Sequence, residues 1–302
     1  MKRIVFIVKG ISKNYSRFES FYERLQAPAY EFSIKSTQYA GHAAELAVEA
    51  VDEGFDCVVA VGGDGTLNEV VNGLFVASKT DIVLAHLPLG TANDFAKSQG
   101  LKLDPDHFLD LLKHKKHRPI DIGHLTAIDD NGKPVSKYFI NILSVGLGGH
   151  IVETVDKDER TLPSKKMKFF KAITQGMYKF KKPIVAIEAE EFSYKGPLMM
   201  LAVCNAGNFG SGLTINPDAK IDDGIFHLTL AGDVSVQDYI ANYFKLKKGK
   251  RMSHPNISYH AANTVSITCK QEIPCPMEID GEFVGYPPAN VTMIKSGIRL
   301  LF

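Results

Sequence analysis

A glycine-rich stretch at residues 62–66, which reads GGDGT, stands between an apolar run and a segment with helical spacing. Glycine adopts positive φ and lets backbone N–H groups approach a ligand without an intervening Cβ. The N-terminus of a following helix favours a phosphate group, and Thr66 is placed to cap that helix. The stretch therefore predicts a phosphate-binding loop, although a tight turn with Asp64 solvated at its tip would use the same residues.

Asp64, at the centre of this stretch, is an unusual neighbour for phosphate. The spacing matches neither GxxxxGK[ST] nor GxGxxG, so the two common nucleotide fingerprints do not apply. A carboxylate beside a polyphosphate is repelled unless a divalent cation lies between them. Asp64 is therefore a candidate for organising magnesium on ATP.

A second loop of the same kind covers residues 88–96, which read PLGTANDFA and follow the apolar run 82–87. Here too a strand passes into a helix through Gly and Thr. In a parallel sheet both helix starts lie at the carboxyl edge of the strands, where ligands bind. The two loops are expected to face one ligand, and a plain helix-capping role for Asn93 and Asp94 is the alternative.

Both loops resemble the catalytic domain of diacylglycerol kinases. GGDGT is similar to the signature shared by diacylglycerol, sphingosine, ceramide and NAD kinases and, more distantly, phosphofructokinases, and GTANDFA at 90–96 is similar to the lipid-kinase version. The resemblance implies ATP as co-substrate and places Asp94 close to the transferred phosphate. The nucleotide-binding residues that it implies are Gly62, Gly63, Asp64, Gly65, Thr66, Leu67, Asn68, Thr91, Asp94 and Thr37.

One departure from the family lies after the first apolar run. Members often carry an N-P-x-[SA]-G loop there, whereas this chain has Lys9 and Gly10 followed by Ile, Ser and Lys. The contacts that the family's loop would make are therefore not carried over to this chain.

Residues 278–282, which read EIDGE, resemble the family's D-G-E motif. The resemblance implies that Glu282 is the general base and that Asp280 helps by orienting it or by binding metal. Phosphoryl transfer needs such a base, because a lipid hydroxyl is a poor nucleophile until a carboxylate accepts its proton. Asp-Gly is also a hairpin signal, so a plain turn between two strands is the alternative.

A further segment, residues 216–225, resembles the part of bacterial members that holds a structural magnesium. By position, the carboxylate of Asp223 and the carbonyl groups of Lys220 and Ile225 would be the ligands. Hard oxygen donors suit magnesium, which keeps several waters. An ordinary Asp-Gly turn is the alternative.

Strands and helices alternate along the first third of the chain. Apolar runs predict strands at 3–8, 30–36, 56–61 and 82–87, and helical spacing predicts helices at 16–25, 41–51 and 67–77. This alternation is typical of a doubly wound parallel sheet.

Short strands punctuated by Gly, Pro and Asn follow from about residue 121. They are expected at 123–128, 137–143, 184–190, 198–204, 225–230, 256–260, 264–268, 282–284 and 291–294. The first two would form a hairpin through residues 129–132, where Asn-Gly is a strong turn signal. The fold class is therefore α/β, with a mainly antiparallel β-sandwich as the second part.

We predict two domains, which suit a length of 302 residues. An α/β nucleotide-binding domain would span residues 1–125 and be completed by residues 292–302. A β-sandwich domain that carries the lipid site would span residues 126–291.

The composition limits where in the cell the protein is expected and what it is expected to bind. Lys plus Arg number 35 and Asp plus Glu 34, so no global field attracts nucleic acid, and none is expected as a partner. Four cysteines without C-x-x-C spacing predict free thiols in a reducing compartment. The first apolar run ends at Lys9, too soon for a signal peptide, and no run approaches the roughly 18 apolar residues of a membrane span. We expect a cytoplasmic protein.

Contact with a membrane is expected from residues 157–182, which are rich in Lys and interleaved with Phe, Tyr and Met. Cations suit anionic headgroups and aromatic rings suit the acyl boundary, so the segment would give transient, peripheral association. A solvated helix whose rings face the core is the alternative. A symmetric homodimer is compatible with the sequence but leaves no pattern in it.

The substrate remains open at this level. Diacylglycerol is favoured, and phosphatidylglycerol, a polyprenol and a sphingoid base also offer a hydroxyl. A soluble phosphotransferase of the NAD kinase type is disfavoured by residues 91–96, and an inactive lipid-binding regulatory protein by the joint presence of Asp64, Asp94 and Glu282.

Overall fold

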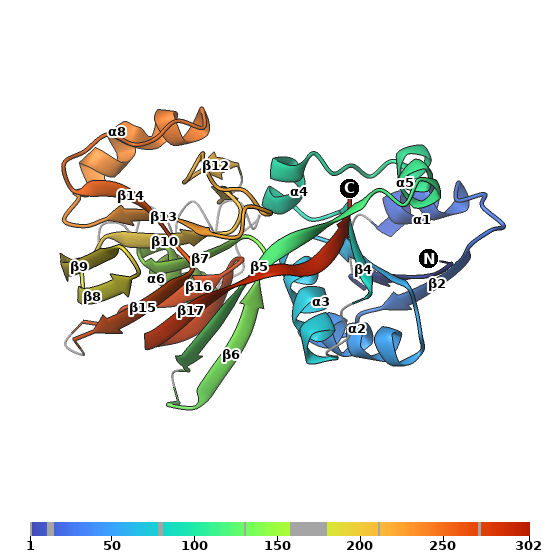
Figure 1. Cartoon of the computed structure of the whole chain (residues 1–302), viewed down its shortest axis with the longest axis horizontal. Helices are drawn as coiled ribbons and strands as arrows, with labels where there is room; N and C mark the ends of the chain where they lie inside the picture. Colours follow the sequence, from blue (N-terminus) through green and yellow to red (C-terminus); the bar gives the residue numbers. More distant parts are fainter. Residues whose placement is uncertain are drawn as a thin grey trace.

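The computed structural model describes residues 2–10, 15–77, 81–129, 131–157, 180–210, 212–270 and 273–302. The chain forms two lobes, one α/β and one mainly β, with strands β5 and β17 running between them (Figure 1). Most of the basic aromatic segment, residues 158–179, lies outside the described residues. None of the helices that the structure describes is long and apolar enough to cross a membrane.

The first lobe is a parallel sheet covered on both faces. Its elements are β1 (Arg3–Val8), α1 (Tyr15–Glu23), β2 (Glu31–Ser36), α2 (His42–Asp52), β3 (Cys57–Gly62), α3 (Asp64–Val76), β4 (Val83–Pro88), α4 (Asp94–Gln99) and α5 (Pro105–Lys113). The strands lie in the order β2-β1-β3-β4, all parallel. One apolar cluster joins the sheet to α2 and α3, and another joins its other face to α1 and α5. The doubly wound prediction is confirmed.

The second lobe is a β-sandwich. Its elements are β5 (His117–Ile128), β6 (Pro134–Phe139), β7 (Ile142–Gly146), α6 (Leu147–Lys157), β8 (Ile184–Ala189), β9 (Phe192–Pro197), β10 (Met200–Cys204), β11 (Asn208–Phe209), β12 (Leu213–Thr214), β13 (Phe226–Ala231), α8 (Val236–Lys247), β14 (Ile257–Ala262), β15 (Thr264–Cys269), β16 (Met277–Ile279) and β17 (Glu282–Leu301). The layer β14-β13-β10-β7-β16 packs on β9-β8-β15-β17-β5-β6, with an apolar core between them. The predicted antiparallel sandwich is confirmed.

Strand β17 belongs to both lobes. It pairs with β16 and β15 in the sandwich, runs antiparallel to β5, and ends parallel to β4, with Leu300 opposite Leu84. Figure 1 shows it as the red strand that crosses from one lobe to the other. Residues 282–284 and 291–294 are in strand conformation as expected, but their separation into two short strands was wrong, because one strand contains both. Residues that signal turns at 287–288 and 296–297 are accommodated as irregularities within one strand.

Two other boundaries differ from the prediction. Helix α3 begins at Asp64 rather than at residue 67, so Thr66 lies inside the helix and Gly63 is its N-cap. The expected strand 137–143 is interrupted between β6 and β7, because the backbone N–H groups of Ile140 and Asn141 bond to a side chain instead of a neighbouring strand. The predicted antiparallel pairing of β5 with β6 is confirmed, with Ile128 opposite Pro134, and residue 130 of the connecting turn lies outside the described residues. The division of the chain near residue 125 stays a prediction.

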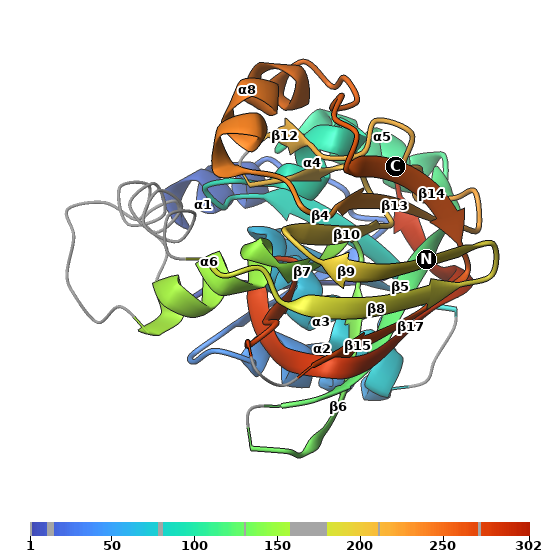
Figure 2. The same ribbon diagram turned by 90° about the vertical axis from the view of Figure 1, so that its left-hand side faces the viewer.

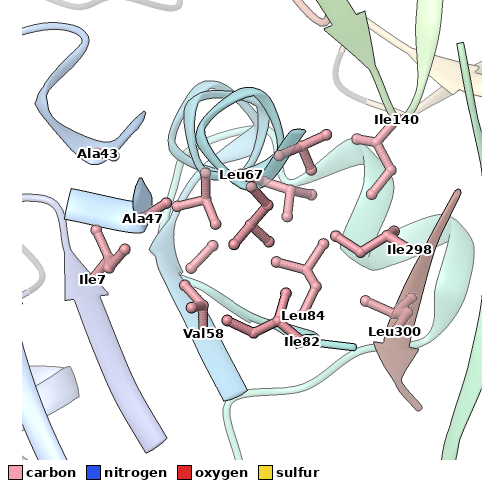
Figure 3. Close-up of a cluster of buried hydrophobic side chains, with 14 of the residues drawn as sticks. Ile7, Ala43, Ala47, Val58, Leu67, Ile82, Leu84, Ile140, Ile298 and Leu300 are labelled. Carbon is pink, nitrogen blue, oxygen red and sulfur yellow. The ribbon is translucent and has the colours of Figure 1, made fainter. Parts of the chain in front are cut away.

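The core beneath α3 connects the first lobe to the end of β17. Figure 3 shows Leu67 of α3 close to Leu84 of β4, with Ile298 and Leu300 of β17 beside them. All four side chains are buried. The C-terminal strand therefore completes the core on which the first loop rests.

We expect Leu300→Ala to lower the free energy of unfolding by about 3 kcal/mol, because it leaves a cavity in this core. Arg299→Ala is the matched control, since that half-exposed side chain forms a long 3.9 Å ion pair with Asp81 and its loss should cost less than about 1 kcal/mol. Urea unfolding followed by circular dichroism measures both. Equal losses would mean that β17 does not contribute to the core of the first lobe.

Candidate active site

The two glycine loops touch. Gly62 ends β3 directly opposite Pro88 at the end of β4, and its carbonyl oxygen accepts hydrogen bonds from the N–H groups of Leu89 (2.7 Å) and Gly90 (3.1 Å). A Cβ built on Gly90 would lie 2.4 Å from the Cα of Gly63. Two backbones can approach so closely only without side chains, which explains why both loops need glycine at these points.

Asp64 joins the first loop to the second. Its carboxylate oxygens accept hydrogen bonds from the backbone N–H groups of Asp94 and Phe95, each at 3.1 Å. Asn93 forms no side-chain cap on α4 and instead exchanges two hydrogen bonds with Gly90. The start of α4 is thus capped from the neighbouring loop, an arrangement that the sequence did not predict.

The D-G-E motif brings a carboxylate from the second lobe to the first loop. Asp280 and Gly281 form a tight turn between β16 and β17, with φ of 50° and 90°, and Ile279 pairs with Glu282 across it. A Cβ built on Gly65 would lie 3.4 Å from Oε1 of Glu282. The segment is thus the Asp-Gly hairpin named as the alternative, and this hairpin carries Glu282 to the glycine loop. The role of Glu282 as general base stays a prediction.

The carboxylate of Asp280 is a structural anchor. Its oxygens accept hydrogen bonds from the N–H groups of Ile140 (3.0 Å), Asn141 (3.1 Å) and Ile142 (2.9 Å), and from Nδ2 of Asn68 on α3 (2.8 Å). Burial raises the pKa of Asp280 to about 6, and these donors oppose that rise. The group is therefore ionised at neutral pH and fixes the D-G-E turn to both lobes.

A second side chain of α3 strengthens this junction. Nδ2 of Asn72 donates to the carbonyl oxygen of Tyr138, and Oδ1 of Asn72 accepts from the N–H of Tyr138, both at 2.9 Å. Asn68 also donates to the Tyr138 carbonyl oxygen at 3.0 Å. Helix α3 is thus hydrogen-bonded to the end of β6 through side-chain amides. The sequence of the helix did not predict this contact.

Two buried ionisable groups border the site. Glu278 accepts a hydrogen bond from the N–H of Gly281 (2.9 Å), and burial raises its pKa to about 8, with the charge of Asp280 adding to the rise. His86 lies on β4 beneath the first loop, with Nε2 3.4 Å from the Gly62 carbonyl oxygen, and burial lowers its pKa to about 4. Both are neutral near pH 7. The sequence signal for His86 was a single ionisable residue within an apolar run.

Three other predicted residues occupy different surroundings. Oγ1 of Thr37 accepts the N–H of Gly10 at 3.1 Å, and a Cβ on Gly10 would lie 2.0 Å from the Thr37 carbonyl oxygen. The side chain of Leu67 is wholly within the core, whereas Thr91 is exposed in the second loop, ahead of α4. Their part in nucleotide binding stays a prediction.

The candidate structural-metal segment is a turn next to β13. Oδ2 of Asp223 lies 2.8 Å from Nε2 of His227, and the N–H of Gly224 donates to the carboxylate of Asp121 at 2.7 Å. The described residues contain no cluster of three His, Cys, Asp or Glu side chains suited to a metal ion. The predicted site uses one carboxylate and the carbonyl groups of Lys220 and Ile225, so it does not depend on such a cluster, and it stays a prediction.

These features place the chain in the class of two-lobed kinases in which a β-sandwich faces an α/β nucleotide lobe. A model of the diacylglycerol kinase catalytic domain matches residues 3–125, and a model of the YegS C-terminal NAD kinase beta sandwich-like domain matches residues 141–302. The second match alone covers more than half of the chain. The chain therefore belongs to the family that carries a YegS C-terminal NAD kinase beta sandwich-like domain, and its first part matches the diacylglycerol kinase catalytic domain. Together with the relatives named diacylglycerol kinase, these matches make the protein a lipid kinase.

Curated relatives agree with this assignment, and solved structures share the fold. The chain is 29% identical over 280 residues to the diacylglycerol kinase of Bacillus subtilis (strain 168), covering 92% of this chain and 88% of the relative. It is 27% identical over 284 residues to that of Staphylococcus saprophyticus, covering 92% and 87%. A crystal structure of a diacylglycerol kinase from Bacillus anthracis shares the fold, with a TM-score of 0.70, 18% identity and coverage of 100% and 96%. A yeast NADH kinase complexed with NADH has a TM-score of 0.53 at 10% identity, covering 99% and 83%.

Gly90→Ala is expected to push the two loops apart, because the new Cβ would overlap the backbone of Gly63. We expect ATP affinity, measured by isothermal titration calorimetry, to fall at least about tenfold, the scale of a loop displaced by about an ångström. Lys97→Ala, at an exposed position of α4, should bind as the wild type does. Unchanged affinity in Gly90→Ala would show that the loop contact does not shape the binding site.

Glu278→Gln should make stability less dependent on pH. The folded protein keeps the Glu278 proton up to a pKa of about 8, while the ordinary value is 4.5, so the folded state binds more protons in between. Wild-type stability must then fall as the pH rises through this window. Relative to wild type, the variant should gain about 2–4 kcal/mol between about pH 5 and about pH 8, measured by urea unfolding. Exposed Glu188→Gln is the control, and parallel curves for Glu278→Gln and wild type would contradict the buried, neutral state.

Proposed function

We propose that the protein transfers the γ-phosphate of ATP to the hydroxyl group of diacylglycerol, which gives phosphatidic acid and ADP. The observation that carries this proposal is the position of Glu282, whose carboxylate lies against Gly65 in the first glycine loop. A base from one lobe thereby faces the phosphate loop of the other, as in-line transfer requires. The relatives named diacylglycerol kinase support this choice of acceptor.

In the proposed reaction, the lipid hydroxyl oxygen attacks the γ-phosphorus as its proton passes to Glu282. The bond from the γ-phosphorus to the bridging oxygen breaks, and ADP leaves with that oxygen. The glycine loops supply backbone N–H groups for the phosphates, together with the start of α3, since the first N–H groups of α4 are taken by Asp64. Asp280 keeps the turn that carries Glu282 in place through its four hydrogen bonds.

Asp64 and Asp94 are the carboxylates of the loops, so they are the groups that would hold magnesium beside ATP. The donor set fits, because carboxylate oxygens are hard ligands and Asp64 is already held in place by two N–H groups. Magnesium, when bound, supplies positive charge that neutralises the phosphates. In the second lobe we propose Asp223, with the carbonyl groups of Lys220 and Ile225, as a structural magnesium site of the same oxygen-donor kind.

Glu282→Gln tests the base. The variant cannot accept the hydroxyl proton, so kcat should fall by about 10²- to 10⁴-fold. The assay measures phosphatidic acid made from ATP and dispersed short-chain diacylglycerol. Glu191→Gln, an exposed glutamate in the turn between β8 and β9, should be fully active. A Glu282→Gln variant with wild-type turnover would refute the proposed role of the base.

The acceptor is tested with a panel of lipids and labelled ATP. Diacylglycerol should be labelled well ahead of phosphatidylglycerol, a polyprenol and a sphingoid base, and NAD should not be labelled. Faster labelling of another lipid would replace diacylglycerol in the proposal, and labelling of NAD alone would overturn the lipid assignment.

A further inference from the structure

Helix α8 presents aromatic and basic side chains together on its outer surface. Phe244 is 70% exposed and Tyr243 is 41% exposed, and their rings meet edge to face with centroids 5.7 Å apart. Basic residues follow at once along the chain. We define the α8 patch as Tyr243, Phe244, Lys245, Lys247, Lys248 and Lys250.

The exposure of these rings follows from how α8 is fixed. A capping box between Ser235 and Asp238 begins the helix, and Leu246 packs its side chain into the core beneath. Asn242 is also buried, and its Oδ1 accepts the N–H of Ser253 at 3.2 Å. Because residues 242 and 246 share the inner face, 243 and 244 must point outward. The rings are therefore held on the surface by a well-anchored helix.

The part of the chain that carries the patch has basic side chains and no acidic ones. Residues 239–260 contain no Asp or Glu. Within the described ranges, no ion pair involves Lys245, Lys247, Lys248 or Lys250. The neighbouring carboxylates already have partners: Asp218 pairs with Arg251, Asp233 with Lys182, and Asp238 with Ser235 and His254. The lysines are thus available to an external anion.

We propose that the α8 patch docks the protein on an anionic lipid membrane, an inference that rests on the proposed lipid kinase function. Exposed aromatic rings suit the acyl boundary, and lysines beside them suit anionic headgroups. A second copy of the chain fits less well, since two such patches would bring lysines together while the nearby carboxylates are already engaged. The residues of the patch are not part of the basic aromatic segment at 157–182 of the sequence.

The patch is coupled to the active site by one small hairpin. Helix α8 packs on β12, β12 pairs with β11, and β11 contacts α4, the helix that begins at Asp94. Thr214 of β12 also lies near the end of α8, where a Cβ on Gly249 would be 3.8 Å from its Oγ1. Docking through α8 would therefore bring the second glycine loop towards the surface that contains the substrate.

Vesicle sedimentation without diacylglycerol or ATP tests the docking alone. Wild type should bind vesicles of phosphatidylcholine with phosphatidylglycerol, bind poorly to phosphatidylcholine alone, and be released by salt. Phe244→Ser should weaken binding about tenfold, and Lys247→Gln with Lys248→Gln about thirtyfold at low salt. Both variants should keep wild-type turnover on dispersed short-chain diacylglycerol.

Two matched controls separate the patch from general surface effects. Val76→Ser alters a residue of α3 that is 71% exposed, nearly the same as Phe244. Lys133→Gln with Lys137→Gln removes two exposed charges near β6, at the side of the molecule opposite α8 in Figures 1 and 2. Both controls should bind vesicles as the wild type does.

Several results would overturn the docking proposal. These are absence of wild-type binding to the anionic vesicles, equal binding by the patch and control variants, and a wild-type dimer that Phe244→Ser separates on size exclusion. The last would assign the patch to a second copy. Vesicle binding as expected, with no lipid phosphorylated in the panel, would support the docking and count against the proposed reaction only.

Discussion

The carboxylate of Asp280 is the point on which the two lobes depend. Three consecutive N–H groups at 140–142 and the amide of Asn68 all converge on it, so one charge ties together α3, the β6–β7 junction and the turn before β17. A buried donor left unpaired costs about 1–3 kcal/mol, so removing this carboxylate would leave several donors at that cost. Glu282 lies two residues further along, and its position over Gly65 is a consequence of this anchor.

The two glycine loops also hold each other in place. Gly63 and Gly90 meet backbone to backbone, and Asp64 accepts the N–H groups that open α4. The conformation of each loop therefore depends on contacts with the other. The acidic side chain that looks unfavourable beside phosphate from sequence alone is therefore also a helix cap, and its negative charge is partly balanced before any ligand arrives.

Local patterns made much of this predictable. The alternation of apolar runs and helices identified the parallel sheet, and the glycine loops and the D-G-E turn were visible because their geometry depends on a few adjacent residues. The family resemblance supplied the class of enzyme. The sequence placed Thr66 at a cap it does not occupy, since Asp64 already lies within the helix.

Contacts between residues far apart in the chain could not be predicted from the sequence. Asn68 and Asp280 are 212 positions apart, and nothing in either neighbourhood pairs them. The neutral state of Glu278 arises from packing around it, and the same residue on an exposed strand would be charged. Strand β17 was divided into two because turn-forming residues were weighed locally, whereas pairing with β5 carries the strand through them.

The course of β17 also bears on how the chain is made. The first lobe lacks a strand of its sheet and part of its core until Ile298 and Leu300 have been synthesised, after the whole sandwich. A nascent chain therefore carries an open edge at β4 throughout translation of the second lobe, and such edges invite mispairing. The long pairing with β5 reduces this risk. Once β17 has paired with β5 along the sandwich, its C-terminal end already lies in the register that it needs to pair with β4.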